Sequence, residues 1–378
     1  MKGVFQYLRT LPGLFLSIAI FATLLQAQDA GAIIEDSIRA VGSKKAIAGV
    51  RNIRSIADCT GPNGKYTTEI YSADGQRLIF RQVRAGNVYT GHTNGSVFWT
   101  KDEKTGDFSL AGTSEAFAWR SHDYQMLIMD PAARFRDPVF EAEETFAGAA
   151  ANKLRATDEL GKPAYLFFDK NSKLMLGFTI QNPFSTKPET IRTIFNEWKR
   201  AGKLMLPSKV TATDKQGDFV LNFTGISLNK IDEKVFLVPQ KVVAMNELLV
   251  LHNQARAAHF NRDPELLVSD FADDYMFVGG GKIQKPAREA SITRFRSYFN
   301  NSTFLEWDDI TPPVIKVSDD ATMGYILVHK KVRLLAKNEN GRQQEETEIY
   351  AWLATYRKIG GKWKLTTIAS TNTPEADR

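Results

Sequence analysis

Cysteine is almost absent from this chain of 378 residues, because Cys59 is its only one. A single cysteine excludes an internal disulfide and a thiolate metal cluster. We therefore expect Cys59 to be a half-buried thiol on a strand. The stability of the chain must then come from the burial of apolar side chains.

Histidine is also scarce, with five residues in the whole chain. His252 and His259 are seven residues apart and share one side of a predicted helix, and His329 is the third candidate for a metal site. Metal-binding histidines on a helix usually sit three or four residues apart, and no acidic residue is tied to these by spacing. The run Gly279 to Lys282 lacks the pattern of a phosphate-binding loop. We expect no metal ion and no cofactor.

Long hydrophobic runs are missing except near the N-terminus. The run Leu11 to Leu25 follows Lys2 and Arg9 and precedes Ala27, a small residue suited to cleavage, although Leu25 stands where a small residue is preferred. The run is shorter than the roughly 20 residues of a spanning helix. We therefore predict a cleaved signal peptide over residues 1–27 rather than an anchor, and a periplasmic or secreted protein. We expect no other segment to span a membrane.

A concentrated charge of one sign is missing as well. The formal net charge is +6, and the lysines and arginines are scattered along the chain rather than massed on one helix. This distribution indicates solubility and gives no footprint for nucleic acid, so we expect no nucleic-acid partner. The length and the 43% hydrophobic content fit two ordinary globular domains.

Residues 29–240 carry the pattern of a first domain. An amphipathic helix over 32–41 precedes runs of alternating polar and apolar residues from Val50 onward. Asp74-Gly75 and Asn94-Gly95 are hairpin signals between such runs. One helical stretch, residues 114–135, interrupts the strands, and Pro131 is expected to end or redirect it. We predict a long, curved antiparallel sheet with one helix before it and one helix inserted.

This first domain resembles the LolA/LolB-like periplasmic proteins. The resemblance is carried by the opening helix at residues 37–42, by Trp99 after Asn94-Gly95, by Leu206-Pro207 before a strand, and by the closing residues 226–236. It implies an incomplete antiparallel β-barrel plugged by helices. It also implies an apolar cavity, which in some relatives holds lipid acyl chains.

The inserted helix carries four candidate ligand-binding residues: Phe117, Trp119, Met126 and Met129. A curved sheet with an apolar inner face must bury that face against helices or a ligand. The alternative is that these side chains simply plug the barrel, since aromatic and methionine stripes at helical spacing are usually core. No arginine or lysine is identifiable as a partner for a lipid headgroup.

Residues 241–378 carry the pattern of a second, α+β domain. A long helix precedes Asp263-Pro264, which suits the start of a short helix over 265–271. We expect Asp273-Asp274 to form a turn before a strand over 275–278. Asp308-Asp309 is expected to end a strand and to be structural. A further helix and several long strands follow.

The order of these elements resembles the NTF2-like, SnoaL-like group, specifically its DUF4440-type members. The residues that carry the resemblance are Ala258-His259-Phe260 with Asp263, Phe271 to Tyr275, Gly281, Arg294-Phe295, Tyr298-Phe299, Pro312-Pro313 and Gly361 to Lys364. It implies a cone-shaped α+β barrel with a pocket between the helices and the concave face of the sheet. It also implies a homodimer formed through that sheet.

The candidate chemistry of the second domain rests on three residues. His259 is a candidate general base, with Tyr275 or Tyr298 as its partner, whereas the alternative is that His259 is a half-exposed helix residue. Trp352 and Tyr356 are candidate ligand-binding residues, because such rings line pockets with a polar tip. The last strand, residues 363–370, offers no histidine or acidic residue inside the cone, which disfavours an acid–base enzyme.

Two functional hypotheses follow from the sequence. The first is an exported, non-catalytic protein that binds an apolar small molecule or lipid in the half-barrel, with an NTF2-like domain for a second ligand or for dimerisation. The second is an NTF2-like enzyme of the proton-transfer or lyase type that uses the cone pocket. A third possibility is a scaffold of two interaction modules without an open pocket.

Overall fold

The computed structural model describes residues 30–74, 76–337 and 341–374. The predicted signal peptide lies outside the described residues. The chain divides into two compact units, Met1–Thr105 with Ala111–Leu237, and Gly106–Leu110 with Val238–Arg378. The two units are termed unit 1 and unit 2.

Unit 1 begins with two helical segments, at residues 30–41 and at α2 (Lys44–Ala48). The first segment buries Ala30, Ile34 and Val41 in the main core of the unit. The hydroxyl of Ser43 accepts a hydrogen bond from the backbone N–H of Ala46 and so caps α2. The helix predicted at 32–41 is therefore confirmed.

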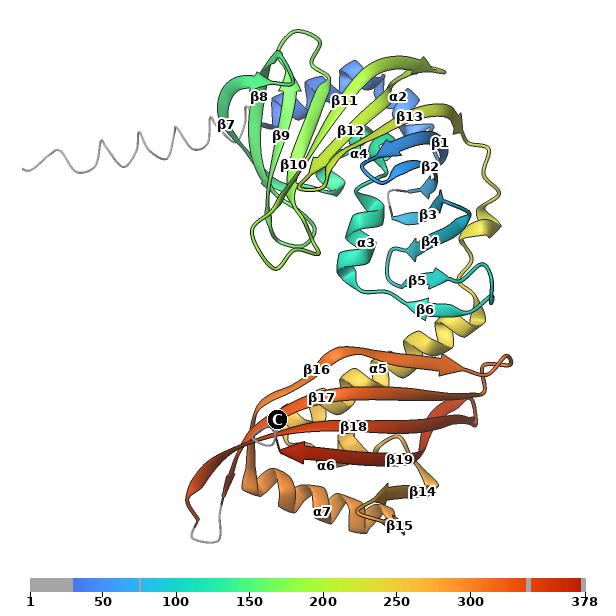
Figure 1. Ribbon diagram of the computed structural model, residues 1–378, viewed down its shortest axis with the longest axis vertical. Helices are drawn as coiled ribbons and strands as arrows, with labels where there is room; N and C mark the ends of the chain where they lie inside the picture. The colour runs from blue at the N-terminus through green and yellow to red at the C-terminus, as the bar shows by residue number, and fades with distance from the viewer. Residues whose placement is uncertain (1–29, 75, 338–340, 375–378) are drawn as a thin grey trace, which may run out of the picture. The chain divides into compact units, whose positions relative to one another are not determined.

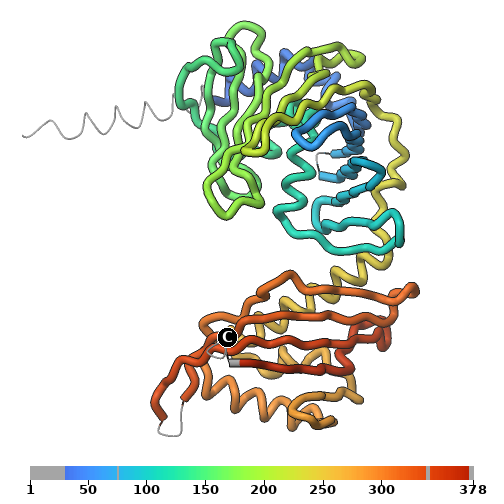
Figure 2. The backbone as a smooth tube through the Cα atoms, viewed as in Figure 1, coloured from blue at the N-terminus to red at the C-terminus, as the bar shows by residue number. Residues whose placement is uncertain are grey.

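A 13-stranded sheet forms the body of this part of the chain, and neighbouring strands in it pair antiparallel (Figure 1). Its order is β6-β5-β4-β3-β2-β1-β13-β12-β11-β10-β9-β8-β7, so β6 and β7 stand at the two ends and the sheet is open. The strands β1–β4 and β7–β10 form the two wings of one curved surface (Figure 2). Their bounds are β1 (Asn52–Gly61), β2 (Gly64–Ala73), β3 (Arg77–Arg84), β4 (Asn87–Asn94), β5 (Phe98–Lys101), β6 (Phe108–Leu110), β7 (Arg136–Phe146), β8 (Ala149–Thr157), β9 (Pro163–Asp169), β10 (Met175–Gln181), β11 (Thr190–Ala201), β12 (Leu204–Asp214) and β13 (Gly217–Leu228).

The helical stretch predicted over 114–135 is present and ends at Pro131 as predicted, but it is divided by a break that was not predicted. The segment forms α3 (Thr113–Arg120), α4 (Tyr124–Met129) and a short 3-10 turn, η1 (Pro131–Ala133). The break falls at Asp123, whose buried carboxylate accepts a hydrogen bond from Ser72 on β2 and faces Arg134. These tertiary contacts fix a non-helical backbone at Asp123, with φ −83° and ψ 64°.

Helices α3 and α4 lie on the concave side of the sheet (Figure 1). Phe117, Tyr124 and Leu127 from these helices join strand residues such as Phe178 and Leu221 in one buried cluster. The helices therefore fill much of the opening of the half-barrel. Cys59 lies in this cluster and is 3% exposed, so it is more buried than the half-buried thiol expected.

The helices of unit 2 are α5 (Gln240–Asn261), α6 (Pro264–Val268) and α7 (Arg288–Asn301). The carboxylate of Asp263 accepts from the backbone N–H of Leu266, and Pro264 occupies the first turn of α6, as predicted. The helix ends at Val268, and Phe271 already belongs to β14. The predicted helix end at 271 and the predicted turn at Asp273-Asp274 are therefore wrong.

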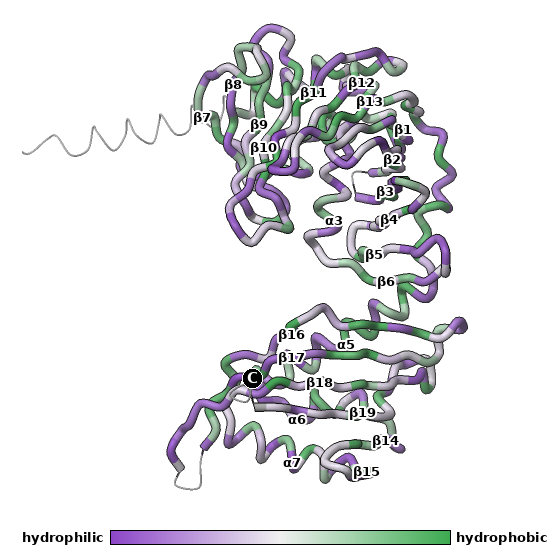
Figure 3. The backbone as a smooth tube through the Cα atoms, in the orientation of Figure 1, coloured by the Kyte–Doolittle hydropathy of each residue, from purple (hydrophilic) through white to green (hydrophobic). Residues whose placement is uncertain are grey.

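A six-stranded sheet, ordered β15-β14-β19-β18-β17-β16, completes the fold of unit 2. The pair β14–β19 is parallel and the other pairs are antiparallel. Hydrophilic and hydrophobic residues follow each other along the strands, as expected for a sheet with one covered face (Figure 3). The bounds are β14 (Phe271–Gly279), β15 (Lys282–Gln284), β16 (Ser302–Val317), β17 (Met323–Lys337), β18 (Gln343–Ile359) and β19 (Lys362–Pro374).

Strand β16 continues through Pro312-Pro313. Its register against β17 shifts between Asp309 and Val314, and β16 stands at the end of the sheet order. An edge strand with bulges tolerates prolines, because their missing N–H groups do not interrupt an inner ladder. Asp308 and Asp309 consequently lie within the strand rather than at its end, which corrects the prediction.

One helical stretch passes a test for membrane spanning by length and composition, contrary to expectation. An 18-residue window within Glu233–Asn261, a stretch that includes α5, has a mean hydropathy of 1.3. However, α5 buries Met245, Leu248 and His252, and the first two belong to the core cluster of unit 2. One side of α5 therefore packs in the core of unit 2, whereas Val243 and Val250 on the same helix are exposed.

Candidate functional site

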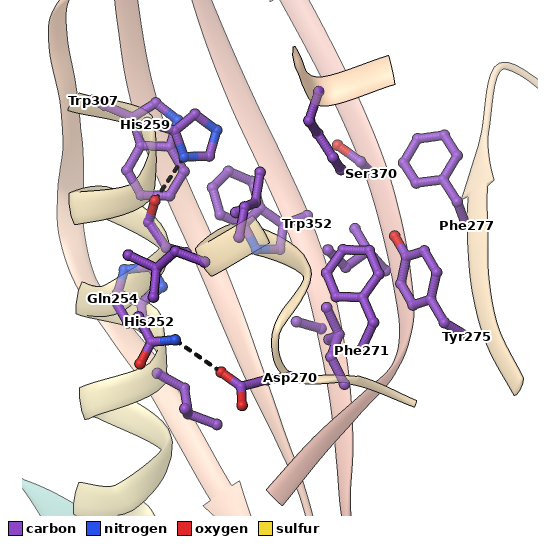
Figure 4. Close-up of a pocket in the computed structure, with 18 of the residues that line it drawn as sticks. His252, Gln254, His259, Asp270, Phe271, Tyr275, Phe277, Trp307, Trp352 and Ser370 are labelled. Carbon is purple, nitrogen blue, oxygen red and sulfur yellow. Dashed lines mark hydrogen bonds between the residues drawn. The ribbon is translucent and has the colours of Figure 1, made fainter. Parts of the chain in front are cut away.

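A cavity of about 470 Å³ lies between the helices and the sheet of unit 2 (Figure 4). Apolar and aromatic side chains form most of its wall. The main lining residues are Leu251, His252, Gln254 and His259 on α5, Asp270, Phe271, Tyr275 and Phe277 on and before β14, Arg294, Phe295 and Tyr298 on α7, and Trp307, Tyr350, Trp352, Tyr356 and Ser370 on the other strands. We term it the cone cavity.

The cone cavity brings together the catalytic and ligand-binding candidates that the sequence placed in the second domain, whereas His329 does not line it. His259, Tyr275, Tyr298, Trp352 and Tyr356 all line it. They come from α5, β14, α7 and β18, so residues separated by up to 97 positions share one wall.

His259 is buried, at 9% exposure, so the half-exposed alternative is wrong. Its ring stacks on Trp307, with 4.4 Å between centroids, and meets the edges of Phe299 and Phe304. Its Nδ1 lies 2.7 Å from the carbonyl oxygen of Ala255, one turn earlier, so Nδ1 carries the proton and donates. Burial lowers the pKa of His259 to about 4. The ring is therefore neutral at pH 7, with Nε2 as an acceptor.

The tyrosines in the wall are also neutral. Burial raises the pKa of Tyr275 to about 12. Burial, together with the nearby carboxylates of Glu348 and Glu346, raises the pKa of Tyr298 to about 12. These rings present apolar faces to the cavity and hydroxyl groups that donate or accept.

An ion pair between the buried Lys330 and the partly exposed Asp309 supports one wall of the cavity and was missed by sequence reasoning. Asp309 on β16 accepts from Nζ of Lys330 at 2.7 Å and lies 2.8 Å from Nε2 of His252. Lys330 is 1% exposed, and its Nζ lies 3.7 Å from the centre of the Trp307 ring. The sequence does contain a signal, because Lys330 falls on the inward phase of β17 between Val328 and Val332.

The protonation of this pair follows from burial and hydrogen bonding. Burial lowers the pKa of Lys330, and Asp309 counteracts that effect. Burial by itself raises the pKa of Asp309, but the hydrogen bonds from His252 and Lys330 outweigh it and hold that pKa below its usual value. These contacts favour the ionised form of Asp309 and hold His252 and Trp307 in the cavity wall.

Asp270 is the acidic residue among the described lining residues of the cone cavity. Nε2 of Gln254 donates to its Oδ2 at 3.1 Å and to the hydroxyl of Ser269 at 3.0 Å (Figure 4). A side-chain amide thus holds this carboxylate beside α5.

A second cavity, of about 440 Å³, lies in unit 1 and is termed the half-barrel cavity. Of the four candidates on the inserted segment, Phe117 lines it. Trp119, Met126 and Met129 are not lining residues. Trp119 packs in a separate cluster with Ile70 and Phe80, and Met129 is buried in the main core.

A basic residue also stands in the wall of the half-barrel cavity, although the sequence identified none. Arg84 lines the cavity and lies over the ring of Tyr66, with 4.6 Å from its Cζ to the ring centre. The alternation of residues along β3 does not identify Arg84 as a lining residue, because the strand also carries Arg77 and Arg81. Only the packing of neighbouring strands and helices decides which of these arginines lines the cavity. Lys215 and Glu189, which form an ion pair, line the same cavity.

The described ranges contain no group of three or more histidine, cysteine or acidic residues arranged to hold a metal ion. No polar contact in them joins His259 to Tyr275 or Tyr298 either. The cone cavity therefore offers aromatic faces, hydroxyl groups and the neutral imidazole of His259, together with the carboxylate of Asp270 and the guanidinium of Arg294.

Neither a protein-family model nor a curated protein matches the chain. Solved structures similar to it include a LolA-superfamily protein from Nitrosomonas europaea (TM-score 0.42, 12% identity, 55% of this chain and 97% of that chain). A DUF1329 family protein from Desulfovibrio piger has a TM-score of 0.40 and 13% identity over 55% of this chain and 97% of that chain. An NTF2-like protein from Cytophaga hutchinsonii has a TM-score of 0.27 and 18% identity over 34% of this chain and 97% of that chain. The similar structures thus include proteins of both superfamilies that the sequence resembles, each at low identity.

Proposed function

We propose that this protein is a non-catalytic binding protein for apolar small molecules or lipids. The observation that carries the proposal is the cone cavity, with its volume of about 470 Å³ and its wall of aromatic rings. Binding sites for small molecules typically span about 300–1,000 Å³ and combine apolar walls with a few polar groups. The half-barrel cavity offers a second site of similar size.

The wall of the cone cavity favours an apolar body. Phe271, Phe295 and Trp352 offer ring faces, and an apolar ligand that covers them gains free energy by leaving water. The neutral imidazole of His259 supplies an acceptor at Nε2 that orients a hydroxyl or amide group of the ligand. A strongly hydrated ligand would lose its water without comparable compensation.

The half-barrel cavity suits an acyl chain or another apolar molecule. Phe117, Phe178 and Phe219 contribute its apolar wall. We assign it the lipid-binding role that the resemblance to LolA-like proteins implies. Such a role agrees with an exported protein, and the predicted signal is tested by sequencing the N-terminus of the secreted form, which should start at Gln28.

An enzymatic role of the cone cavity is the second candidate. It is favoured by one observation, namely that His259 lines the same cavity as Tyr275 and Tyr298. Against it, a base with a pKa of about 4 is poorly matched to proton abstraction at neutral pH. In addition, Nδ1 of His259 is already occupied by the carbonyl of Ala255. Binding without catalysis therefore fits the geometry better.

A homodimer through the sheet of unit 2 belongs to the proposal. Val314, Leu327 and Leu353 lie opposite one another on β16, β17 and β18, and their exposed fractions are 48%, 49% and 38%. A row of exposed apolar side chains on a sheet face is typical of an interaction surface. We term these three residues the outer row.

The experiment that tests the binding proposal is extraction of the purified full-length protein with organic solvent, followed by mass spectrometry. We expect an apolar compound to co-purify in a fixed ratio to the protein. Ser370→Phe fills the cone cavity, and Thr371→Phe is the matched control, because neighbouring strand residues face opposite sides. Loss of a compound in the first variant alone locates it in the cone cavity. No bound compound in any form of the protein would count against the proposal.

A further inference from the structure

Arg294 on α7 lines the cone cavity, and no ion pair with an acidic residue of the described ranges neutralises its charge. Its guanidinium lies over the ring of Phe295, 4.6 Å from the ring centre, and 5.8 Å from the centre of the Phe277 ring. Within the described ranges no carboxylate forms an ion pair with it. Arg296, two residues further along the same helix, does pair with Glu265. The guanidinium of Arg294 therefore remains available to an anionic ligand, whereas that of Arg296 is already paired with a carboxylate.

Stacking on phenyl rings leaves the edge of a guanidinium free. When the face of this planar group covers a ring, its N–H groups point outward in the plane. Two parallel N–H donors on that edge match the two oxygens of a carboxylate. Arg294 is also exposed, so an anion bound to it keeps part of its hydration.

Tyr275 supplies a neutral donor near the same place. Its hydroxyl lies close enough to Arg294 for the positive charge to affect it, and Tyr275 and Phe277 are neighbours on the same face of β14 (Figure 4). A carboxylate at Arg294 would therefore have a hydroxyl group within its surroundings as well as a guanidinium.

We propose that the cone cavity selects apolar carboxylic acids, with the carboxylate on Arg294 and the hydrocarbon body among Phe271, Phe295 and Trp352. This inference rests on the proposed binding function and adds the chemical class of the ligand. The position of Asp270 sets the orientation of the ligand in the cavity. Its carboxylate repels the carboxylate of the ligand from the part of the wall beside α5.

The test uses two pairs of probes that differ only in the head group. These are 1-naphthaleneacetic acid with 1-naphthaleneacetamide, and decanoic acid with decanamide, each titrated calorimetrically into the full-length protein at pH 7.5. We expect at least one acid to bind at least about tenfold more tightly than its amide, since a hydrogen-bonded charge pair contributes that much. Raising the salt concentration should weaken the binding of the acid and leave the binding of the amide unchanged.

Substitutions separate Arg294 from the general charge of the protein. In Arg294→Gln the preference for the acid should disappear while the amide binds as before. Arg294→Lys keeps the charge but loses the paired donors, and should retain part of the preference. Arg296→Gln removes one positive charge from the same helix outside the cavity and should behave as the unmodified protein.

The outcomes distinguish this inference from the proposed function. Equal binding of acid and amide, or a preference for the acid that survives Arg294→Gln, would overturn the inference and leave the binding function intact. Failure of all four probes to bind the cone cavity would overturn both.

Discussion

At the scale of single residues, the ion pair of the buried Lys330 with the partly exposed Asp309 makes the sharpest prediction about stability. Asp309→Ala leaves the charge of Lys330 buried without its partner, and we expect it to lower the free energy of unfolding by about 3 kcal/mol. The double variant Asp309→Ala/Lys330→Met removes both charges and should recover most of the loss. Urea unfolding measures all of these values.

Asp308 provides the matched control for this pair. It is the neighbouring acidic residue on β16, it forms an ion pair with Arg256, and both side chains are about half exposed. Exposed ion pairs contribute roughly 0–1 kcal/mol, so Asp308→Ala should have a small effect. If Asp309→Ala and Asp308→Ala lowered the free energy of unfolding equally, the charge of Lys330 would not need Asp309 as its partner.

His259 makes a prediction about pH. Burial lowers its pKa to about 4, whereas the unfolded chain takes up the proton near pH 6.5. The folded-state value is the lower one, so the stability is complete above about pH 6.5 and is lost progressively as the pH falls toward 4. The NMR signals of the His259 ring should titrate in the folded protein with a midpoint near pH 4. A midpoint near pH 6.5 would contradict the buried position.

The sequence identified cavity residues correctly where the type of side chain, aromatic or titratable, was itself the criterion. His259, Tyr275 and Trp352 were selected as aromatic or titratable residues, and all three line one cavity. Lys330 and Asp309 were not paired in advance, because their contact joins two strands whose register shifts nearby. Arg294 belonged to a recognised motif, but its lack of an acidic partner depends on side-chain positions that no pattern contains.

At the scale of elements, helix α3 is held by a close contact with strand β4. A side chain at Gly91 would place Cβ 2.3 Å from ring atoms of Trp119, whose Nε1 donates to the hydroxyl of Tyr89 at 3.0 Å. Gly91→Ala must therefore displace α3, and we expect a loss of about 1–3 kcal/mol in the free energy of unfolding. Thermal unfolding followed by tryptophan fluorescence measures it.

Gly225 on β13 is the control for Gly91. A Cβ at Gly225 meets only Ile56, at 3.9 Å, which is an ordinary contact. Gly225→Ala should change the stability little. If both substitutions were tolerated equally, Trp119 would not be anchored against β4.

Most strands followed from alternation and turn residues, whereas the boundaries of short helices did not. Gly64, Gly86 and Gly95 adopt positive φ values in turns that the sequence marks, so local chemistry decides those hairpins. The break at Asp123 instead depends on Ser72 and Arg134, which are distant in sequence. A local pattern therefore cannot find it.

At the scale of the whole molecule, the proposed dimer makes a prediction about the outer row. Leu327→Glu places a charge in the centre of this row, and we expect it to convert a dimer into a monomer, because an unpaired charge is costly in an apolar interface. Light scattering after size-exclusion chromatography measures the mass. Lys331→Glu, on the same strand outside the row, is the control for added negative charge. A protein that is monomeric without substitution would remove this part of the proposal.

The architecture of the whole chain was predicted more fully than its function. The sequence indicated a curved antiparallel sheet followed by an α+β domain, and the structure has a 13-stranded open sheet and a six-stranded sheet with helices. The periodicity of side chains contains that information. The volume of each cavity does not follow from periodicity, because it depends on how Phe117, Trp352 and their neighbours pack in three dimensions.

The measurement that tests the central claim most directly is the binding of an uncharged apolar fluorophore, N-phenyl-1-naphthylamine, to the purified protein. The account predicts saturable binding of the fluorophore. Ser370→Phe should weaken this binding by at least about tenfold and Thr371→Phe should leave it unchanged, because Ser370 lines the cone cavity and Thr371 does not. Binding that is absent, or that both variants leave unchanged, would contradict the claim that the cone cavity binds apolar molecules.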